Sequence, residues 1–499
     1  MASTVEAQSS TAASEQQFIR GIGPIQAISL VVGSMIGSGI FIVSSGISRE
    51  VAAWGPGGLM LVWILTGLMT VAGALAYAEL AAMMPKAGGQ YVFLREGLAP
   101  SIGFLFGWTL FAVIQTGTIA AVAVAMAKYL AVFFPSLTDT IFLSLGSIRL
   151  PGSAEAIPLG VSVQRLIAIA SIVFLSFINA RGVAVGARLQ TFLTFIKAIA
   201  LAALVLLGII VFRRADVAGA NFGANFWGTG SWTLAMLPVI GAAMVGSLFS
   251  SDAWNNVTFA AAEVREPSRN LPRALAIGTG VVTLLYILAN VSYLSVLPFA
   301  GDPAGTTAVA RGIQHATQDR VASAAVDVML GSVGAALMAG LIVISTFGCN
   351  AGLVLAGPRV YFAMARDRLF FRRAGELHPG LRTPVFGLIV QAIWASVLCL
   401  SGTYNQLLDY VIFASVLFYF LTTLALFRLR RIRPDLPRPV KAFGYPVVPA
   451  LYLVAAAALM IVLLIKKPLF TWPGLVIVAL GIPVYLVWRR SAMQAETQP

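Results

Sequence analysis

Apolar residues occur along this chain in twelve long runs, with polar residues gathered between them. A transmembrane helix needs about 17–25 predominantly apolar residues, and every run reaches that length. The pattern therefore predicts an all-α membrane protein with twelve transmembrane helices. The runs lie at residues 24–48, 57–84, 100–133, 162–179, 187–212, 235–262, 271–298, 327–363, 384–400, 405–427, 444–465 and 470–488.

Composition and charge agree with this class. The chain is 59% hydrophobic and 10% charged, whereas soluble domains carry roughly 25% charged residues. If the N-terminus is cytoplasmic, the inner ends of the runs carry 21 Lys and Arg residues and the outer ends carry ten. This is the positive-inside bias, and an even number of spans then places both termini in the cytoplasm. The net charge of +14 thus reflects topology and lipid headgroups, not nucleic-acid binding.

The first apolar run is interrupted at mid-length by Gly37, Ser38 and Gly39. Each glycine costs a helix about 1 kcal/mol relative to alanine. Non-helical backbone at membrane depth is tolerated only inside protein or beside a water-filled cavity. We predict an unwound helix centre, whose free amides suit a carboxylate. The alternative is close packing of glycines against a neighbouring helix, and Gly33 fits that role.

The sixth run holds a second interruption, with polar residues from Ser250 to Asn256. Broken helices at corresponding positions of two five-helix halves indicate an inverted repeat with the substrate site between them. Asp252 inside this run is expected to be functional, to cap the second half-helix, or to do both. The predicted divisions are a disordered tail at 1–20, a transporter core at 21–430 with repeats at about 21–213 and 234–430, helices eleven and twelve at 431–490, and a tail at 491–499.

Other polar residues also lie inside the runs. Lys197 is too far from the end of its run to reach the interface and needs protein partners. Gln115 and Thr118 either line the pocket or hydrogen-bond neighbouring helices. Glu79 is expected to pair with Arg95 or Arg269, Arg359 to lie at the membrane interface, and Cys349 and Cys399 to form no disulfide. We find no nucleotide-binding loop, catalytic triad or metal-ligand spacing, so we expect neither an enzyme nor a cofactor or metal site.

Several stretches together resemble one known family. Residues 33–41 (GSMIGSGIF) are similar to the first-helix signature of the amino acid–polyamine–organocation (APC) superfamily. The chain resembles the bacterial type of its L-type amino acid transporter branch, and the resemblance covers residues 19–490. The stretches that carry this closer resemblance are 85–91 (PKAGGQY), 179–182 (NARG), 249–254 (FSSDAW), 263–272 and 433–441.

The resemblance implies a LeuT-type fold with a 5+5 inverted repeat, broken helices 1 and 6, and amino acid transport by alternating access. It places the substrate carboxylate on the amides of the first break and the ammonium group on carbonyls at Met35, Phe249 and Asp252. Phe249 would also close over the substrate. The predicted substrate-binding residues are Met35, Ile36, Gly37, Ser38, Gly39, Gln115, Thr118, Phe249, Ser250, Ser251 and Asp252.

The resemblance also implies how transport is coupled and which partners bind. It places Lys197 where sodium-coupled relatives hold a sodium ion, between the first break and Ser345 and Thr346, so transport would be sodium-independent. Animal members attach to a partner through a cysteine in the loop that here spans 138–161. No cysteine lies in this loop, so we expect no disulfide-linked subunit. The predicted location is the bacterial inner membrane.

Three functions remain open at this level. The leading prediction is a sodium-independent exchanger of small to medium neutral L-amino acids. The second is proton-coupled uptake, with Asp252 or Glu79 titrating. The third is an amino acid sensor built on a transporter fold, which the absence of an attached signalling domain disfavours.

Overall fold

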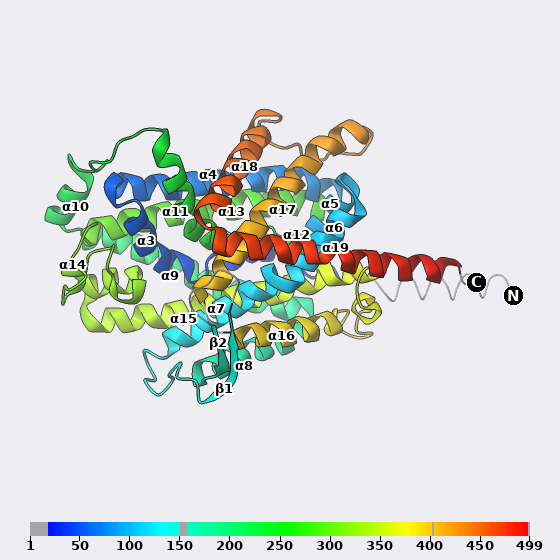
Figure 1. The fold of residues 1–499 in the computed structure, drawn as a ribbon, viewed down its shortest axis with the longest axis horizontal. Helices are drawn as coiled ribbons and strands as arrows, with labels where there is room; N and C mark the ends of the chain where they lie inside the picture. Colours follow the sequence, from blue (N-terminus) through cyan, green and yellow to red (C-terminus); the bar gives the residue numbers. More distant parts are fainter. Residues whose placement is uncertain (1–17, 150–156, 402–403, 498–499) are drawn as a thin grey trace.

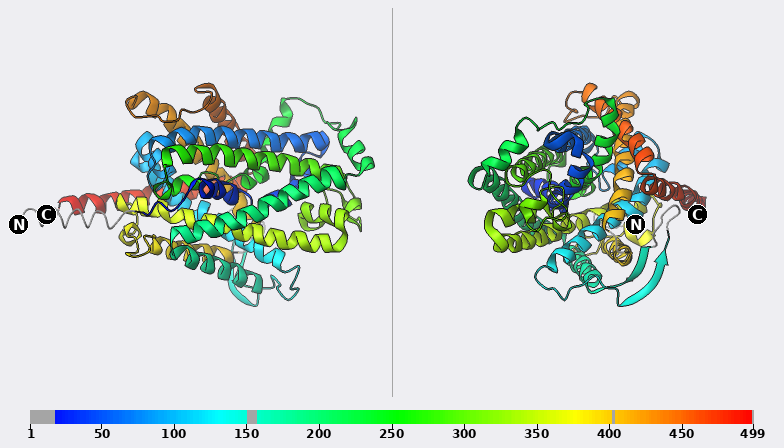
Figure 2. Two further views of the ribbon diagram at one scale, coloured as in Figure 1. Left: turned by 180° about the vertical axis from the view of Figure 1, so that it is seen from behind. Right: turned by 60° about the vertical axis from the view of Figure 1, so that its left-hand side comes forward.

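The computed structural model describes residues 18–149, 157–401 and 404–497, and these form a bundle of long helices (Figure 1). The longest helices run side by side along the horizontal axis of Figure 1, and the views in Figure 2 show the same arrangement. Helix α5 (Gln90–Gly97) lies at one end of the bundle. Helices α10 (Ala215–Phe222) and α14 (Ala308–Arg311) lie at the opposite end.

The remaining α-helices follow the predicted runs. The π-helical turn Leu110–Ile114 joins α6 to α7, and a second one at Leu207–Val211 extends α9. The bounds are α2 (Pro24–Met35), α3 (Gly39–Glu50), α4 (Gly55–Met83), α6 (Pro100–Thr109), α7 (Gln115–Leu130), α8 (Val163–Ala180), α9 (Val183–Leu206), α11 (Leu237–Ser250), α12 (Asn256–Phe259), α13 (Pro267–Val296), α15 (Val321–Arg366), α16 (Val385–Leu400), α17 (Tyr404–Ile432), α18 (Val447–Lys466) and α19 (Pro468–Thr497).

Prolines mark the start of several of these helices. Pro24, Pro100 and Pro267 each occupy the first turn of α2, α6 and α13. The first turn of a helix leaves its N–H groups without intrahelical partners, so a residue that lacks an N–H is tolerated there. The sequence thus sets these boundaries locally.

The helices confirm a multi-pass membrane protein. Within the described part of the chain, ten helical segments are long and apolar enough to cross a bilayer, and Leu234–Ser250 and Val385–Leu400 are shorter apolar helices. Each of the twelve predicted runs therefore contains a helix. That all twelve cross the membrane is part of the proposal made below.

One addition to the helices was not predicted. The loop between α7 and α8 contains strands β1 (Leu143–Ile148) and β2 (Ile157–Val161), which pair in antiparallel register with Leu143 opposite Val161. Outside the bundle, this pairing satisfies backbone groups that an irregular loop would leave to water. Residues 1–17 of the predicted N-terminal tail lie outside the described residues.

The interrupted segments lie in the interior of the bundle. Helix α2 packs against α9, α13 and α15, and α3 packs against α11 and α15. Helix α13 also lies along α4. Residues 29–41 are buried without exception. Any ligand at the first break would therefore be enclosed by protein.

Candidate functional site

The first helical segment is interrupted halfway, between α2 and α3. Helix α2 ends at Met35 and α3 begins at Gly39. Between them Ile36 has φ −74° and ψ 92°, so the backbone leaves the helical path. The last carbonyls of α2 and the first amides of α3 consequently have no partner within their own helices. The break predicted at Gly37, Ser38 and Gly39 is present.

Two glycines near this break also allow close packing. A Cβ atom at Gly39 would lie 2.0 Å from the hydroxyl of Ser250, and one at Gly33 would lie 2.1 Å from the amide nitrogen of Gln190. A Cβ atom at Gly37 would meet nothing closer than 3.3 Å. Packing therefore explains Gly33 and Gly39, and at Gly39 it brings the two broken helices together.

Lys197 of α9 reaches the carbonyl side of the first break. Its Nζ atom donates to the carbonyl oxygens of Gly33 at 2.5 Å, Ile36 at 2.7 Å and Ser345 at 3.3 Å. The side chain is 2% exposed. An ammonium group has three donors, and all three are used. Lys197 thus links α9, the first break and α15.

The two α15 residues expected beside Lys197 behave differently. The hydroxyl of Ser345 contacts the carbonyl oxygens of Ile36 at 3.2 Å and Gly37 at 3.1 Å. The hydroxyl of Thr346 donates instead to the carbonyl of Ile342 in its own helix, at 2.7 Å. Ser345 therefore contacts the break directly, whereas Thr346 does not hydrogen-bond to it.

Tyr286 of α13 joins the two breaks, and sequence reasoning missed it. Its hydroxyl lies 2.9 Å from the carbonyl oxygen of Met35 and 3.0 Å from that of Ser250. A buried tyrosine hydroxyl requires a polar partner, so a tyrosine inside an apolar run was the available signal. The carbonyl of Met35, expected to meet the substrate ammonium, already accepts this hydrogen bond.

The second break separates α11 from α12. Helix α11 ends at Ser250, and α12 begins at Asn256. Between them Ala253 adopts φ +65°, a left-handed conformation that is rare for residues with a Cβ atom. Phe249 lies in the last turn of α11 and is buried. The carbonyl of Phe249 accepts from the amide of Asp252 at 3.2 Å, so the chain turns directly after α11.

Asp252 lies within this second break and contacts α17. Its Oδ1 atom accepts a hydrogen bond from the hydroxyl of Tyr419 at 2.5 Å. The same hydroxyl lies 3.3 Å from Oδ1 of Asn255, whose amide nitrogen donates to Gln90 at 2.7 Å. The N-cap of α12 is Asn255 and makes no side-chain cap. Asp252 precedes this N-cap by three residues, and its carboxylate bonds to Tyr419 of α17.

Two small cavities flank Asp252 and Tyr419. One has a volume of about 10 Å³, the space of about one water molecule, and is lined by Gln115, Thr118 and Asn256 as well as Asp252. The other, of about 20 Å³, is lined by Ser251, Thr70 and Asp252. Both are lined by residues of α17 and of the break between α11 and α12. Four residues predicted to bind substrate therefore line these two cavities: Gln115, Thr118, Ser251 and Asp252.

Gln115 and Thr118 both line the first cavity, but only Gln115 also hydrogen-bonds a neighbouring helix. The amide nitrogen of Gln115 donates to the carbonyl of Leu353 on α15 at 2.7 Å, and the hydroxyl of Thr118 donates to Ile114 at 2.6 Å. Within the described ranges, no three His, Cys, Asp or Glu side chains gather as a metal site requires.

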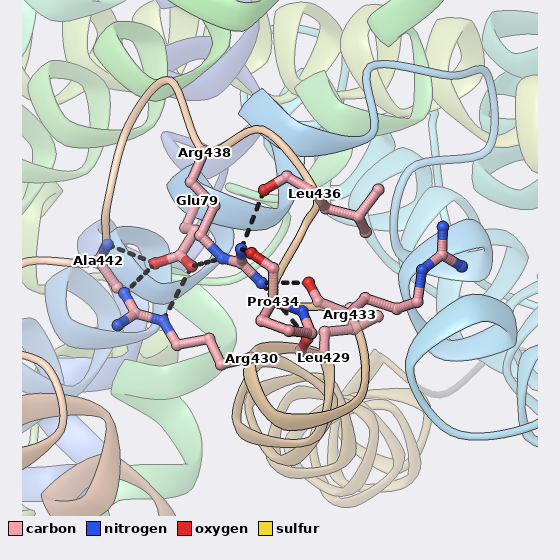
Figure 3. Close-up of polar contacts among 8 residues, drawn as sticks. All are labelled: Glu79, Leu429, Arg430, Arg433, Pro434, Leu436, Arg438 and Ala442. Carbon is pink, nitrogen blue, oxygen red and sulfur yellow. Dashed lines mark hydrogen bonds and ion pairs between the residues drawn. The ribbon is translucent and has the colours of Figure 1, made fainter.

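The predicted partners of Glu79 are wrong. Glu79 is fully buried and pairs with Arg430 at 2.5 Å and with Arg438 at 3.3 Å, and it accepts from the amide of Ala442 at 2.7 Å (Figure 3). These partners come from the end of α17 and the loop that follows it. They are more than 340 residues away in sequence, so no local pattern could select them.

The predicted position of Arg359 is also wrong. Arg359 is 1% exposed and forms a paired contact with the carboxylate of Glu263, at 2.8 and 3.0 Å. Meanwhile Arg95 pairs with Asp367 instead of Glu79. Burial of an arginine requires a partner for its charge, and Glu263 provides one.

Comparison with known proteins assigns the chain to a family. A family model described as "Amino acid permease" matches residues 22–488. The chain belongs to the amino acid permease family. This agrees with the APC resemblance of its sequence, and its relatives are transporters, not enzymes.

Three relatives illustrate the family. The chain is 28% identical to b(0,+)-type amino acid transporter 1 of Mus musculus, over 96% of this chain and 91% of that protein. It is 29% identical to large neutral amino acids transporter small subunit 2 of Homo sapiens, over 93% and 80% respectively. It is also 29% identical to the serine/threonine exchanger SteT of Bacillus subtilis, over 93% and 95%.

Proposed function

We propose that this permease is a sodium-independent exchanger of small to medium neutral L-amino acids that works by alternating access. The observation that carries the proposal is the position of Lys197, whose ammonium group contacts Gly33, Ile36 and Ser345. A fixed positive charge there stabilises the carbonyl oxygens electrostatically, as a bound cation would. The exchanger named among its relatives supports the mode of transport.

The two breaks offer groups of opposite partial charge, which suit the two charged groups of an amino acid. The amides of Gly37, Ser38 and Gly39 lie at the positive start of α3 and suit the carboxylate. Carbonyls at the end of α11, near Phe249, suit the ammonium group. The carbonyls of Met35 and Ser250 both lie within hydrogen-bond distance of the Tyr286 hydroxyl, and each keeps a second lone pair for the ammonium group. The substrate side chain would then point toward the cavity beside Asp252.

The proposed architecture has twelve spans, with α2–α3 and α11–α12 as the broken helices of a LeuT-type 5+5 repeat. Discontinuous helices at corresponding positions are the hallmark of such repeats. Both termini would lie in the cytoplasm of a bacterial inner membrane. Cys349 and Cys399 are buried and free, so neither offers an accessible thiol to a disulfide-linked subunit.

The test is uptake of labelled alanine, serine and leucine into proteoliposomes. We expect uptake to require internal amino acid and to be equal in sodium and choline buffers. The Lys197→Ala variant should lose exchange, whereas Lys128→Ala, which removes an exposed lysine of α7, should retain it. A thermal unfolding scan establishes that each variant is folded. A folded Lys197→Ala protein with undiminished exchange, or wild-type uptake that requires sodium, would contradict the proposal.

A second candidate, proton-coupled uptake, is favoured by one observation. Asp252 is 7% exposed, and no Lys or Arg of the described chain forms an ion pair with it. A buried carboxylate without a cation is a functional hypothesis by default. If it carries the proton, uptake follows a pH gradient without internal substrate, and Asp252→Asn abolishes that response. Uptake that ignores the gradient excludes this candidate.

A further inference from the structure

An apolar groove runs along the membrane-facing side of the bundle between α8 and α16. Its volume is about 610 Å³. Its walls are exposed apolar side chains, with Val173 and Phe177 on α8 and Ile389 and Ile393 on α16. The floor is made of small or buried residues that leave room between the walls, chiefly Ser176, Leu388 and Ala392.

Polar contacts hold the two helices together at both ends of this groove. At one end the hydroxyl of Thr383, just before α16, donates to the carbonyl of Ala180 at 3.1 Å. At the other end the guanidinium of Arg165 donates to the carbonyl of Leu400 at 2.6 Å. The groove is therefore a fixed feature of the fold, and its length matches the helices that border it.

Two polar groups at one end of the groove have no hydrogen-bond or ion-pair partner for their side chains among the described residues. Ser176 is 8% exposed, lines the groove, and its hydroxyl has no hydrogen-bond partner in the described structure. Arg181 follows α8 directly and is exposed; its guanidinium lies 4.5 Å from the ring centroid of Phe177 and forms no ion pair with a described carboxylate. A buried hydroxyl without a partner costs about 1–3 kcal/mol.

We propose that this groove binds one glycerophospholipid with an anionic headgroup. An acyl chain fills the apolar part between α8 and α16. Ser176 lies about one helical turn inside the end of α8, which is the depth of the ester region below the headgroups. Its hydroxyl donates to an ester carbonyl, and Arg181 pairs with the phosphate. Basic residues beside grooves between transmembrane helices recognise such lipids.

The apolar walls, Ser176 and Arg181 match the acyl chain, the ester group and the phosphate of this lipid, in that order. A water molecule would satisfy Ser176 but not fill the apolar walls, and a bare acyl chain would leave both polar groups unpaired. A transmembrane helix of a second copy or of another protein would cover the walls, but an apolar helix brings no anion to pair with Arg181 at the end of the groove. A phospholipid satisfies all three requirements at once.

Native mass spectrometry of the full chain, titrated in detergent with dioleoyl phosphatidylglycerol or dioleoyl phosphatidylcholine, tests this. We expect one phosphatidylglycerol to be retained per chain, and phosphatidylcholine to bind more weakly. Ser176→Ala and Arg181→Gln should each weaken retention about fivefold. Arg273→Gln, which removes an exposed arginine of α13, is the matched control and should leave retention unchanged.

Ala392→Trp fills the floor of the groove and should abolish retention. Thermal unfolding establishes that it is folded, and the milder Ser176→Ala decides the question if it is not. Equal retention of both lipids, equal retention by Ser176→Ala, Arg181→Gln and wild type, or a dimer that Ala392→Trp dissociates would each overturn the proposal.

Discussion

Arg359 donates to both carboxylate oxygens of Glu263, at 2.8 and 3.0 Å, with the two side chains 1% and 0% exposed. Glu263 also accepts, through its backbone carbonyl, from the amide of Ile22 at 2.9 Å. Ile22 precedes α2, Glu263 follows α12, and Arg359 belongs to α15. Glu263 therefore links the start of α2 and the end of α12 to α15, through its backbone carbonyl and its buried ion pair.

Removing one member of this pair should destabilise the protein strongly. Arg359→Leu leaves the carboxylate of Glu263 buried without a cation, which costs about 3–5 kcal/mol. The double variant Glu263→Leu and Arg359→Leu should recover much of that loss, because no unpaired charge remains. Thermal unfolding in detergent measures both. A double variant no more stable than Arg359→Leu would show that the unpaired carboxylate of Glu263 does not cause the loss of stability.

Tyr286→Phe should weaken the connection between the two breaks. The change leaves the carbonyls of Met35 and Ser250 without their hydroxyl donor, at about 1–3 kcal/mol for each group that remains unsatisfied. We expect a lower unfolding temperature and slower exchange. Tyr485→Phe on α19 is the control, since its hydroxyl makes no hydrogen bond with described residues. Equal behaviour of the two variants would show that the Tyr286 hydroxyl is dispensable.

Gly39→Ala should push the broken helices apart. The added Cβ atom would lie 2.0 Å from the Ser250 hydroxyl and 3.0 Å from its Cα atom. Overpacking of this kind costs about 1–3 kcal/mol, and we expect exchange to fall with it. Gly280→Ala is the matched control: nothing lies within 4 Å of its added Cβ atom, so this helix-interior change should be neutral or stabilising by up to about 1 kcal/mol. Normal stability of Gly39→Ala in the same scan would contradict the packing seen here.

Glu79→Ala should release the segment that follows α17. The change leaves the guanidinium groups of Arg430 and Arg438 and the amide of Ala442 without their common acceptor (Figure 3). We expect a loss of about 3–5 kcal/mol. Arg433→Ala is the control, because Arg433 is 51% exposed and its carboxylate partner lies 3.9 Å away; such pairs contribute about 0–1 kcal/mol. Equal changes in the unfolding temperatures of Glu79→Ala and Arg433→Ala would contradict this expected difference.

Sequence patterns located the helices and the two interruptions, because apolar run length and helix-breaking residues act locally. Gly37, Ser38 and Gly39 disfavour a continuous helix. A lysine as far inside an apolar run as Lys197 requires polar partners within the protein. The family resemblance named the break, Ser345 and Thr346 as those partners. Lys197 contacts the break and Ser345, whereas Thr346 bonds within its own helix.

The sequence by itself determined the class of protein, the order of its apolar helices and the places where two of them break, since these depend on composition and local backbone preference. Only the tertiary structure decided which distant groups meet. Tyr286 lies 251 residues from Met35, and Glu79 lies 351 residues from Arg430. Buried polar groups take whichever partner packing brings within hydrogen-bond distance, and that distance is a property of the folded bundle.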